Sequence, residues 1–266
     1  MLRKFYRTSS CDSLNQFIGK KMSDKITIFH DPTSEPSRAV YWLALEAGID
    51  VEVQYTWLTR GDHVSAEFLK VNPLHQVPAM RHGDFCLSEA TAIMNYLTDI
   101  NGCSEKWFGH DMKSKAVVNK YLSWYHTNLR KVLTLDYFLP TLLMPAYLGF
   151  KRPTDADITS KLEAIHTMFS SLDNMLQGKH YLCGDEISSA DLLYVSDIFA
   201  LEIDPNYQQM IEQYPNIVAW IEKLKSLPNY EKCNRAWNHV VPQILALDGG
   251  TKGTPEWVKT ECEKVL

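Results

Sequence analysis

The hydrophobic and polar positions follow different patterns in the two halves of the chain. In the first half, short runs rich in β-branched and aromatic residues alternate with helical stretches. Pro36 suits the first turn of a helix, and Gly48 is placed to end that helix in a left-handed cap. Ser88 is the expected N-cap of a later helix. Strands are predicted at residues 26–30, 51–58, 79–82 and 85–87, and helices at 36–47, 65–71 and 89–99. This order predicts a small α/β domain whose first strand–helix–strand unit is parallel.

The second half has a helical pattern throughout. After a linker near residues 101–108, apolar residues recur at steps of three and four, which is typical of amphipathic helices. Residues 215–227 predict one more helix. The apolar stripes are Val118, Leu122, Tyr125, Leu129 and Val132, followed by Ile158, Leu162, Ile165, Phe169, Leu172 and Leu176. We therefore expect an all-α second half.

Two helix starts carry capping signals. Ser188 is followed three residues later by Asp191, which is the spacing of a reciprocal capping box, and Ile187 with Leu192 would form its hydrophobic staple. Near the C-terminus, Thr254 can cap a short helix that begins at Pro255.

Composition and charge exclude several classes of function. The 266 residues carry a net charge of −5, a poor match to nucleic acid, so we expect no nucleic-acid partner. The longest uncharged stretch, 137–150, has fourteen residues and two prolines, too short to span a membrane as a helix. The six cysteines form no CxxC pair, which indicates a reduced compartment such as the cytoplasm, and no metal site is expected. Phosphate-binding, dinucleotide-binding and hydrolase motifs are absent from the sequence.

Residues 1–22 differ from the rest of the chain. Five basic residues against one acid give this segment a charge of +4, and serines and apolar residues lie between the charges. This composition is typical of a mitochondrial targeting segment. The alternatives are a plain N-terminal extension, or translation that begins at Met22. We expect a cytoplasmic protein, with mitochondrial import as the alternative.

Five segments, in their order along the chain, resemble the cytosolic-type glutathione transferases and the theta class in particular. They are 31–41 (DPTSEPSRAVY), 72–79 (NPLHQVPA), 83–97 (GDFCLSEATAIMNYL), 121–130 (YLSWYHTNLR) and 187–192 (ISSADL). The resemblance spans about residues 26–230. It implies a thioredoxin-like glutathione-binding domain followed by an all-helical domain, usually in a homodimer. We therefore expect a basic extension at 1–22, these two domains at 23–100 and 108–248, and a tail at 249–266.

Ser34 lies between the first strand and the first helix. A hydroxyl there can donate a hydrogen bond to a ligand thiolate, and the positive end of the helix dipole favours the same negative charge. The residues alone leave a second interpretation open, in which Ser34 is the N-cap of the helix. The resemblance implies that Ser34 is the activating serine of theta-like transferases. Thr33 and Ser37 are reserve hydroxyls, and Arg38 is expected to support the loop.

Several other residues are assigned to glutathione through the resemblance. Val77-Pro78 matches a cis-proline element whose backbone pairs with the ligand, although the sequence also allows an ordinary trans proline. His63 and Gln76 match positions that contact the glycine carboxylate and flank the cysteinyl backbone. Glu89, at the start of the third helix, would bind the ligand ammonium.

The chain departs from the family pattern at two of these positions. Ala90 replaces the Ser or Thr that normally follows the acid, so the backbone N–H remains and one hydroxyl donor is lost. Thr91 points about 100° away around the helix and is a poor substitute. Asn119 stands where an acid often reaches the ligand amine across the dimer. A lost hydrogen bond of ~0.5–1.5 kcal/mol and a lost charged one of ~1.5–3 kcal/mol would weaken glutathione binding ten- to a thousandfold.

Two functions remain at this stage. In the first, the chain is a detoxification enzyme that conjugates glutathione, its co-substrate, to small electrophiles, with no further cofactor. In the second, it is a non-catalytic transferase-like subunit of a larger assembly. Tyr121, Trp124 and Tyr125 are either core residues or part of a ligand pocket, and Trp237 with the tail 254–266 either covers the electrophile pocket or docks as ordinary structure.

Overall fold

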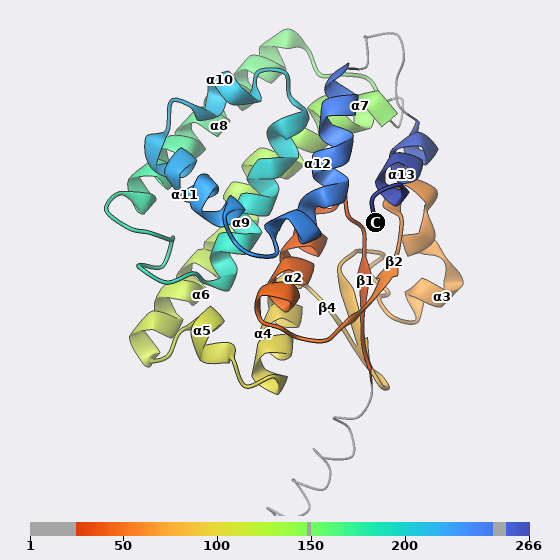
Figure 1. Cartoon of the computed structure of the whole chain (residues 1–266). Coiled ribbons are helices and arrows are strands. Elements are labelled where there is room, and N and C mark those ends of the chain that lie inside the picture. Colours follow the sequence, from red (N-terminus) through yellow and green to blue (C-terminus); the bar gives the residue numbers. More distant parts are fainter. Residues whose placement is uncertain (1–24, 148–149, 247–253) are drawn as a thin grey trace, which may run out of the picture.

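The computed structural model describes residues 25–147, 150–246 and 254–266. The basic segment expected at 1–22 lies outside the described residues. The described chain begins with a mixed sheet and its helices and continues, after Ile100, with helices alone (Figure 1). The predicted α/β domain followed by an all-α domain is therefore confirmed.

The sheet contains β1 (Ile26–His30), β2 (Glu52–Tyr55), β3 (Ala79–His82) and β4 (Phe85–Ser88), in the order β2-β1-β3-β4. The pair β1–β2 is parallel, as the sequence predicted, whereas β1–β3 and β3–β4 are antiparallel. Phe29 is opposite Ala79, and Ala79 is opposite Ser88. The end of β1, the start of β3 and the end of β4 therefore meet at one edge of the sheet.

Alternation along the strands builds two cores, one on each face of the sheet. Ile28 and Met80 point into the larger core with α2 (Glu35–Glu46) and α4 (Ala90–Ile100). Phe29 and Ala79 point into a smaller core with Phe68 of α3 (Ala66–Leu69). The structure confirms the left-handed backbone of Gly48 after α2, with a φ of +66°. The two faces are thus covered by different helices.

The helices after the sheet surround one central helix. Every residue of α9 (Ser189–Ala200) is buried, and α2 packs against it (Figure 1). The remaining helical elements are α5 (Ser104–Phe108), α6 (Met112–Thr127), η3 (Lys131–Leu143), α7 (Met144–Tyr147), α8 (Asp155–Leu176), η4 (Leu201–Ile203), α10 (Tyr207–Ile211), α11 (Pro215–Lys225), α12 (Tyr230–Ala246) and α13 (Pro255–Glu263). The two short 3₁₀ turns η1 (Leu58–Arg60) and η2 (Asp62–Val64) follow β2.

Both capping predictions are confirmed. Ser188 and Asp191 form a reciprocal capping box at the start of α9. The hydroxyl of Thr254 accepts a hydrogen bond from the Trp257 N–H at the start of α13. Because these caps satisfy N–H groups that have no partner inside the helix, they fix where each helix begins.

Four details of the predicted elements are corrected. The N-cap of α4 is Glu89 and not Ser88, which ends β4. The expected linker contains α5. The helix predicted at 118–132 is interrupted at Asn128, whose side-chain amide donates to the Trp124 carbonyl, and a π-helical segment, η3, follows. The second strand ends at Tyr55, because the chain then turns so that the Leu58 N–H donates to the Asp31 carboxylate.

Candidate active site

The predicted site residues of the first domain gather at the sheet edge where β1, β3 and β4 meet. Ser34 follows β1, Val77-Pro78 precedes β3, and Glu89 follows β4. The parallel strand β2 ends at the same edge, because Tyr55 is opposite His30, and it leads through η1 to His63 in η2. The topology therefore places all of these segments at one edge of the sheet.

Ser34 occupies the N-cap position of α2 but does not cap the helix. Its backbone is extended and its side chain makes no capping hydrogen bond to α2. The residue is 8% exposed. Ser34 is therefore the N-cap residue by position only, and its hydroxyl stays available beside the positive end of α2.

The two reserve hydroxyls are less suited to a ligand. The Thr33 hydroxyl donates to the Asp31 carboxylate at 2.7 Å. The Ser37 hydroxyl is buried and has no hydrogen-bond partner among the described residues. Of the three hydroxyls around the start of α2, that of Ser34 is therefore the best placed to meet a thiolate.

Asp31 shapes the loop that carries Ser34. Its fully buried carboxylate accepts hydrogen bonds from the backbone N–H groups of Thr33 and Leu58, each at 2.7 Å. Burial raises the pKa of Asp31, while these hydrogen bonds oppose that rise. The carboxylate thereby ties the loop after β1 to the turn after β2.

Arg38 holds the same loop from the helix side, as the sequence predicted for a supporting residue. Its buried guanidinium donates to the carbonyls of Pro32 and Thr33 and, in the helical domain, to that of Ser196. It also stacks on Trp237, 4.6 Å from the ring centroid. Trp237 is therefore a buried structural residue, which donates its own N–H to the Phe199 carbonyl.

The loop before β3 has the backbone shape that the resemblance implied. The Val77–Pro78 peptide bond is cis. Neither the N–H nor the carbonyl of Val77 has a hydrogen-bond partner in the part of the chain that the structure describes. Asn72 holds the loop by donating to the Gln76 carbonyl at 2.8 Å, and the Gln76 side chain is exposed. His63 is half-buried, and its Nδ1 has no partner within the described ranges.

Glu89 and Ala90 form the N-terminus of α4. Glu89 is exposed and has a φ of +71°, in the region that favours glycine. Such strain costs about 1–3 kcal/mol and concentrates at functional sites. Ala90 is buried, and its N–H lies in the first turn of α4. The Thr91 hydroxyl is buried without a partner in the described residues, and Asn119 is exposed on α6 of the helical domain.

The sequence analysis missed a buried charge cluster that includes Glu35, the residue after Ser34. Glu35, the first residue of α2, lies 3.6 Å from Arg130, which in turn lies 2.8 Å from Asp197 of α9. The signal that was available is Asp197 itself, an acid within an otherwise apolar stretch of a helix predicted to be buried. An acid in such a position needs a buried partner.

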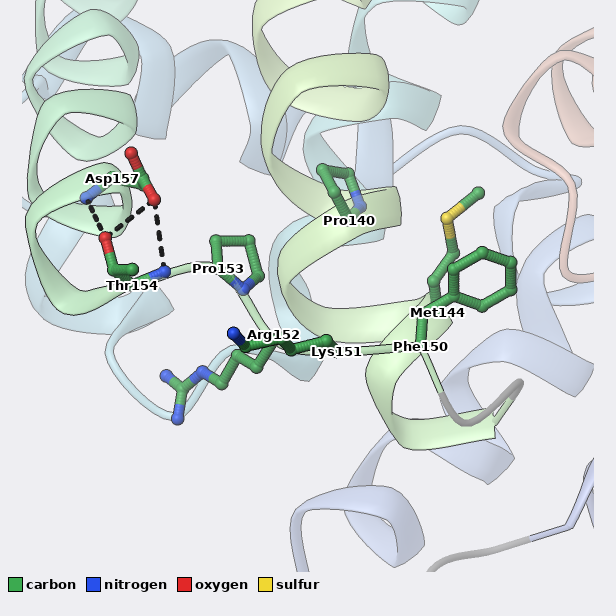
Figure 2. A pocket seen from close by; sticks show the side chains of 8 residues that line it. All are labelled: Pro140, Met144, Phe150, Lys151, Arg152, Pro153, Thr154 and Asp157. Atoms are coloured by element: carbon green, nitrogen blue, oxygen red, sulfur yellow. Dashed lines mark hydrogen bonds between the residues drawn. The ribbon is translucent and has the colours of Figure 1, made fainter.

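The structure contains two cavities, of which the first lies in the helical domain and the second is lined in part by residues at the end of β2. Figure 2 shows one of about 320 Å³ that is lined by Pro140 and Met144 and by residues around the start of α8, including Phe150 and Lys151. Another, of about 370 Å³, lies on the α3 face of the sheet beside Phe29 and Phe68. None of the predicted site residues lines either cavity.

Among the described residues there is no cluster of three or more metal-ligating side chains, and no helix has the length and apolar character needed to cross a membrane.

Comparisons with known proteins give the same assignment for both domains. The family model of the glutathione S-transferase N-terminal domain matches residues 24–99, and that of the C-terminal domain matches residues 145–232. The chain is 32% identical to human glutathione S-transferase theta-1, over 76% of this chain and 82% of the relative. It is 28% identical to rat glutathione S-transferase theta-2, over 81% of this chain and 87% of the relative.

Solved structures agree with these sequence matches. Human glutathione S-transferase T1-1 in its apo form superposes with a TM-score of 0.74 at 28% identity, covering 89% of this chain and 99% of that one. Human glutathione transferase theta-2, in complex with glutathione and an unknown ligand, gives a TM-score of 0.73 at 26% identity, covering 91% and 92%. The chain therefore belongs to the glutathione S-transferase family, and within that family it is similar to the theta class.

Proposed function

We propose that the protein is a glutathione transferase that conjugates the glutathione thiolate to small electrophiles. The observation that carries this proposal is the Ser34 hydroxyl, which makes no cap at the N-terminus of α2 and follows β1 at the sheet edge where β3 begins. Membership of the family and the similarity to theta-class enzymes support the same conclusion. Glutathione is the co-substrate, and the proposed reaction uses no other cofactor.

In the proposed reaction, the Ser34 hydroxyl donates a hydrogen bond to the sulfur of bound glutathione. This bond and the positive end of α2 both stabilise the thiolate, which lowers the pKa of the thiol and raises the fraction of the reactive nucleophile. The thiolate then attacks an electrophilic carbon and forms a carbon–sulfur bond, and a leaving group such as a halide departs with its electron pair. Proximity and stabilisation of the anion are the catalytic contributions.

The rest of glutathione would lie along the same edge. The unpaired N–H and carbonyl of Val77 can pair with the cysteinyl backbone, next to Pro78 and Gln76. Glu89 would bind the ammonium, and the N–H of Ala90 the γ-glutamyl carboxylate, at the N-terminus of α4. His63 would contact the glycine carboxylate, and Asn119 would contribute across a dimer.

We extend the proposal to a homodimer in the cytoplasm, with the glutathione-binding domain at 23–100, the helical domain at 108–248 and a tail at 249–266. In such a dimer, exposed apolar side chains of the two domains would be covered by the partner. They include Leu74, Phe85, Met112 and Val117, which are 36–89% exposed.

The test compares wild type with Ser34→Ala and Ser37→Ala by calorimetric titration with glutathione, the ultraviolet thiolate band and conjugation of a model electrophile. We expect wild type to bind and to show the band. Ser34→Ala should lose the band and about 10²–10³-fold in kcat, because one hydrogen-bond donor to a developing or stabilised anion is worth that much. Ser37→Ala removes a buried hydroxyl one turn away and should leave both unchanged.

Two results would contradict the proposal. Absent or only millimolar glutathione binding by wild type would favour the non-catalytic subunit, for which Ala90 and Asn119 would then be the reason. A thiolate band that persists in Ser34→Ala would show that Ser34 does not stabilise the thiolate.

Light scattering on the same preparation tests the homodimer, which should have twice the chain mass of 30.6 kDa.

A further inference from the structure

Two acids share one guanidinium, and one of these acids, Glu35, directly follows Ser34 in the chain. The Glu35 carboxylate lies 3.6 Å from Nη1 of Arg130, and the same Nη1 donates to Asp197 at 2.8 Å. The Glu35 side chain is 7% exposed and that of Asp197 is fully buried. These three charges come from α2, from the N-cap residue of η3 and from α9, so the cluster lies where the two domains meet.

Hydrogen bonds hold Asp197 in place more firmly than Glu35. The Thr134 hydroxyl donates to the same Asp197 oxygen at 2.5 Å as Arg130 does. The other Asp197 oxygen has no hydrogen-bond partner among the described residues. The nearby Tyr125 hydroxyl is also buried, and burial and the Asp197 charge raise its pKa well above the usual value, so it stays neutral. Arg130 therefore interacts more strongly with Asp197 than with Glu35.

The cluster carries one negative charge in excess when both acids are ionised. Burial raises the pKa of Glu35; Asp197 raises it further, whereas Arg130 and Arg38 lower it. Glu35 therefore gains its negative charge at a higher pH than an ordinary glutamate does. Because Glu35 is in the first turn of α2, its anion competes for the same positive helix end that favours a thiolate at Ser34.

We propose that Glu35 is a positioning residue that raises the pKa of the glutathione thiol bound at Ser34. Together with Asp197 it neutralises the positive charge of Arg130, which would otherwise stabilise the thiolate. Its own carboxylate also repels the thiolate. The inference rests on the proposed function, since it concerns the sulfur bound at that hydroxyl. The two ionisations are coupled, so that each is less favourable when the other has occurred.

The experiment is a pH titration of the thiolate band of bound glutathione, together with the pH profile of kcat/KM. Glu35→Gln keeps the shape of the side chain and removes its charge. We expect the apparent pKa of the bound thiol to fall by about half a unit or more, because a negative charge near the sulfur has been removed. Asp197→Asn should shift it in the same direction. Glu35→Asp, which retains the charge, should titrate like wild type.

The matched control is Glu46→Gln, at the opposite end of the same helix. Glu46 accepts hydrogen bonds from Trp42 and from the Asn229 N–H, and eleven residues of helix place it about 16 Å from Glu35. Its substitution should leave the thiol titration unchanged. A substitution that only loosened the fold would lower stability or raise KM without moving the titration to lower pH.

Three results would overturn the inference: the same titration in Glu35→Gln as in wild type, a shift to higher pH, or an equal shift in Glu46→Gln. Each of these requires that wild type binds glutathione and shows the thiolate band. If wild type shows neither, the proposed function fails instead, and the two failures are thus distinguished.

Discussion

His30, at the end of β1, is a buried base that should make stability depend on pH. The residue is 2% exposed, and its ring lies against those of Tyr41 and Tyr55, with centroids 5.3 and 6.1 Å away. Burial and the charge of Arg38 lower the pKa of His30 from 6.5 to about 3. Between these values the unfolded chain takes up a proton that the folded chain does not. The contribution of His30 to the free energy of unfolding is therefore fully present above pH 6.5 and is lost as the pH falls toward 3.

We predict that His30→Phe reduces this dependence. Phenylalanine keeps the aromatic contact with Tyr41 and cannot be protonated. By the shift of His30, wild type should lose about 2 kcal/mol of unfolding free energy between pH 7.5 and pH 5 that the variant retains. Urea denaturation at the two pH values measures the difference, and His126→Phe, at an exposed histidine, is the control. An equal loss in His30→Phe and wild type would contradict the prediction.

At the residue scale, local motifs predicted the segments that meet at the candidate site but not the charge cluster formed by Glu35, Arg130 and Asp197. Ser34 and Glu89 lie at element ends, where strand and helix signals in the sequence meet, so their places followed from short patterns. The contact between Arg130 and Asp197 joins residues 67 positions apart. Only the packing of α9 against α2 and η3 brings them together, and no local pattern encodes that distance.

At the scale of the element, the start of α9 depends on one carboxylate. Asp191 is fully buried and accepts hydrogen bonds from the Leu182 and Ser188 N–H groups, the Ser188 hydroxyl and the Trp220 indole, at 2.7–2.9 Å. We predict that Asp191→Ala lowers stability by at least about 3 kcal/mol, because several buried donors lose their partner. Thermal melting should show a fall of about 6 °C or more.

The control for this variant is Asp185→Ala, six positions earlier, whose side chain is 87% exposed. This substitution should leave the melting temperature nearly unchanged, because the contact between Asp185 and His180 is exposed and contributes little to stability. Comparable losses in the two variants would mean that the hydrogen bonds of Asp191 do not determine the stability of α9.

Element ends with side-chain signals were predictable, whereas a break within an apolar stripe was not. The caps at Ser188 and Thr254 predicted the first residue of each helix, since a cap fixes the first N–H groups. The stripe from Val118 to Val132 continues through Asn128, where the helix stops. The periodicity of apolar residues depends on which face is buried and is insensitive to a local change in backbone hydrogen bonding.

At the scale of the whole molecule, α2 belongs to both domains. It covers the sheet, carries Ser34 at its start and packs along α9 (Figure 1). A site at the start of such a helix has a fixed position relative to the helical domain, from which electrophile-binding side chains would come. The two domains should therefore unfold together, although the sequence divides them clearly.

Arg38 couples the two domains directly, because it donates to the Pro32 and Thr33 carbonyls in the first domain and to the Ser196 carbonyl in α9. We predict that Arg38→Met, which keeps most of the volume, leaves these acceptors buried without a donor and removes the stacking on Trp237. The free energy of unfolding should fall by about 3 kcal/mol or more, which lowers Tm by at least about 6 °C.

The control for loss of an arginine is Arg235→Met, at an exposed position on α12. Melting followed by tryptophan fluorescence and by far-ultraviolet circular dichroism should coincide in wild type. If the two transitions also coincide in Arg38→Met, at the melting temperature of wild type, the domains are coupled by the apolar packing of α2 on α9 and not by the guanidinium.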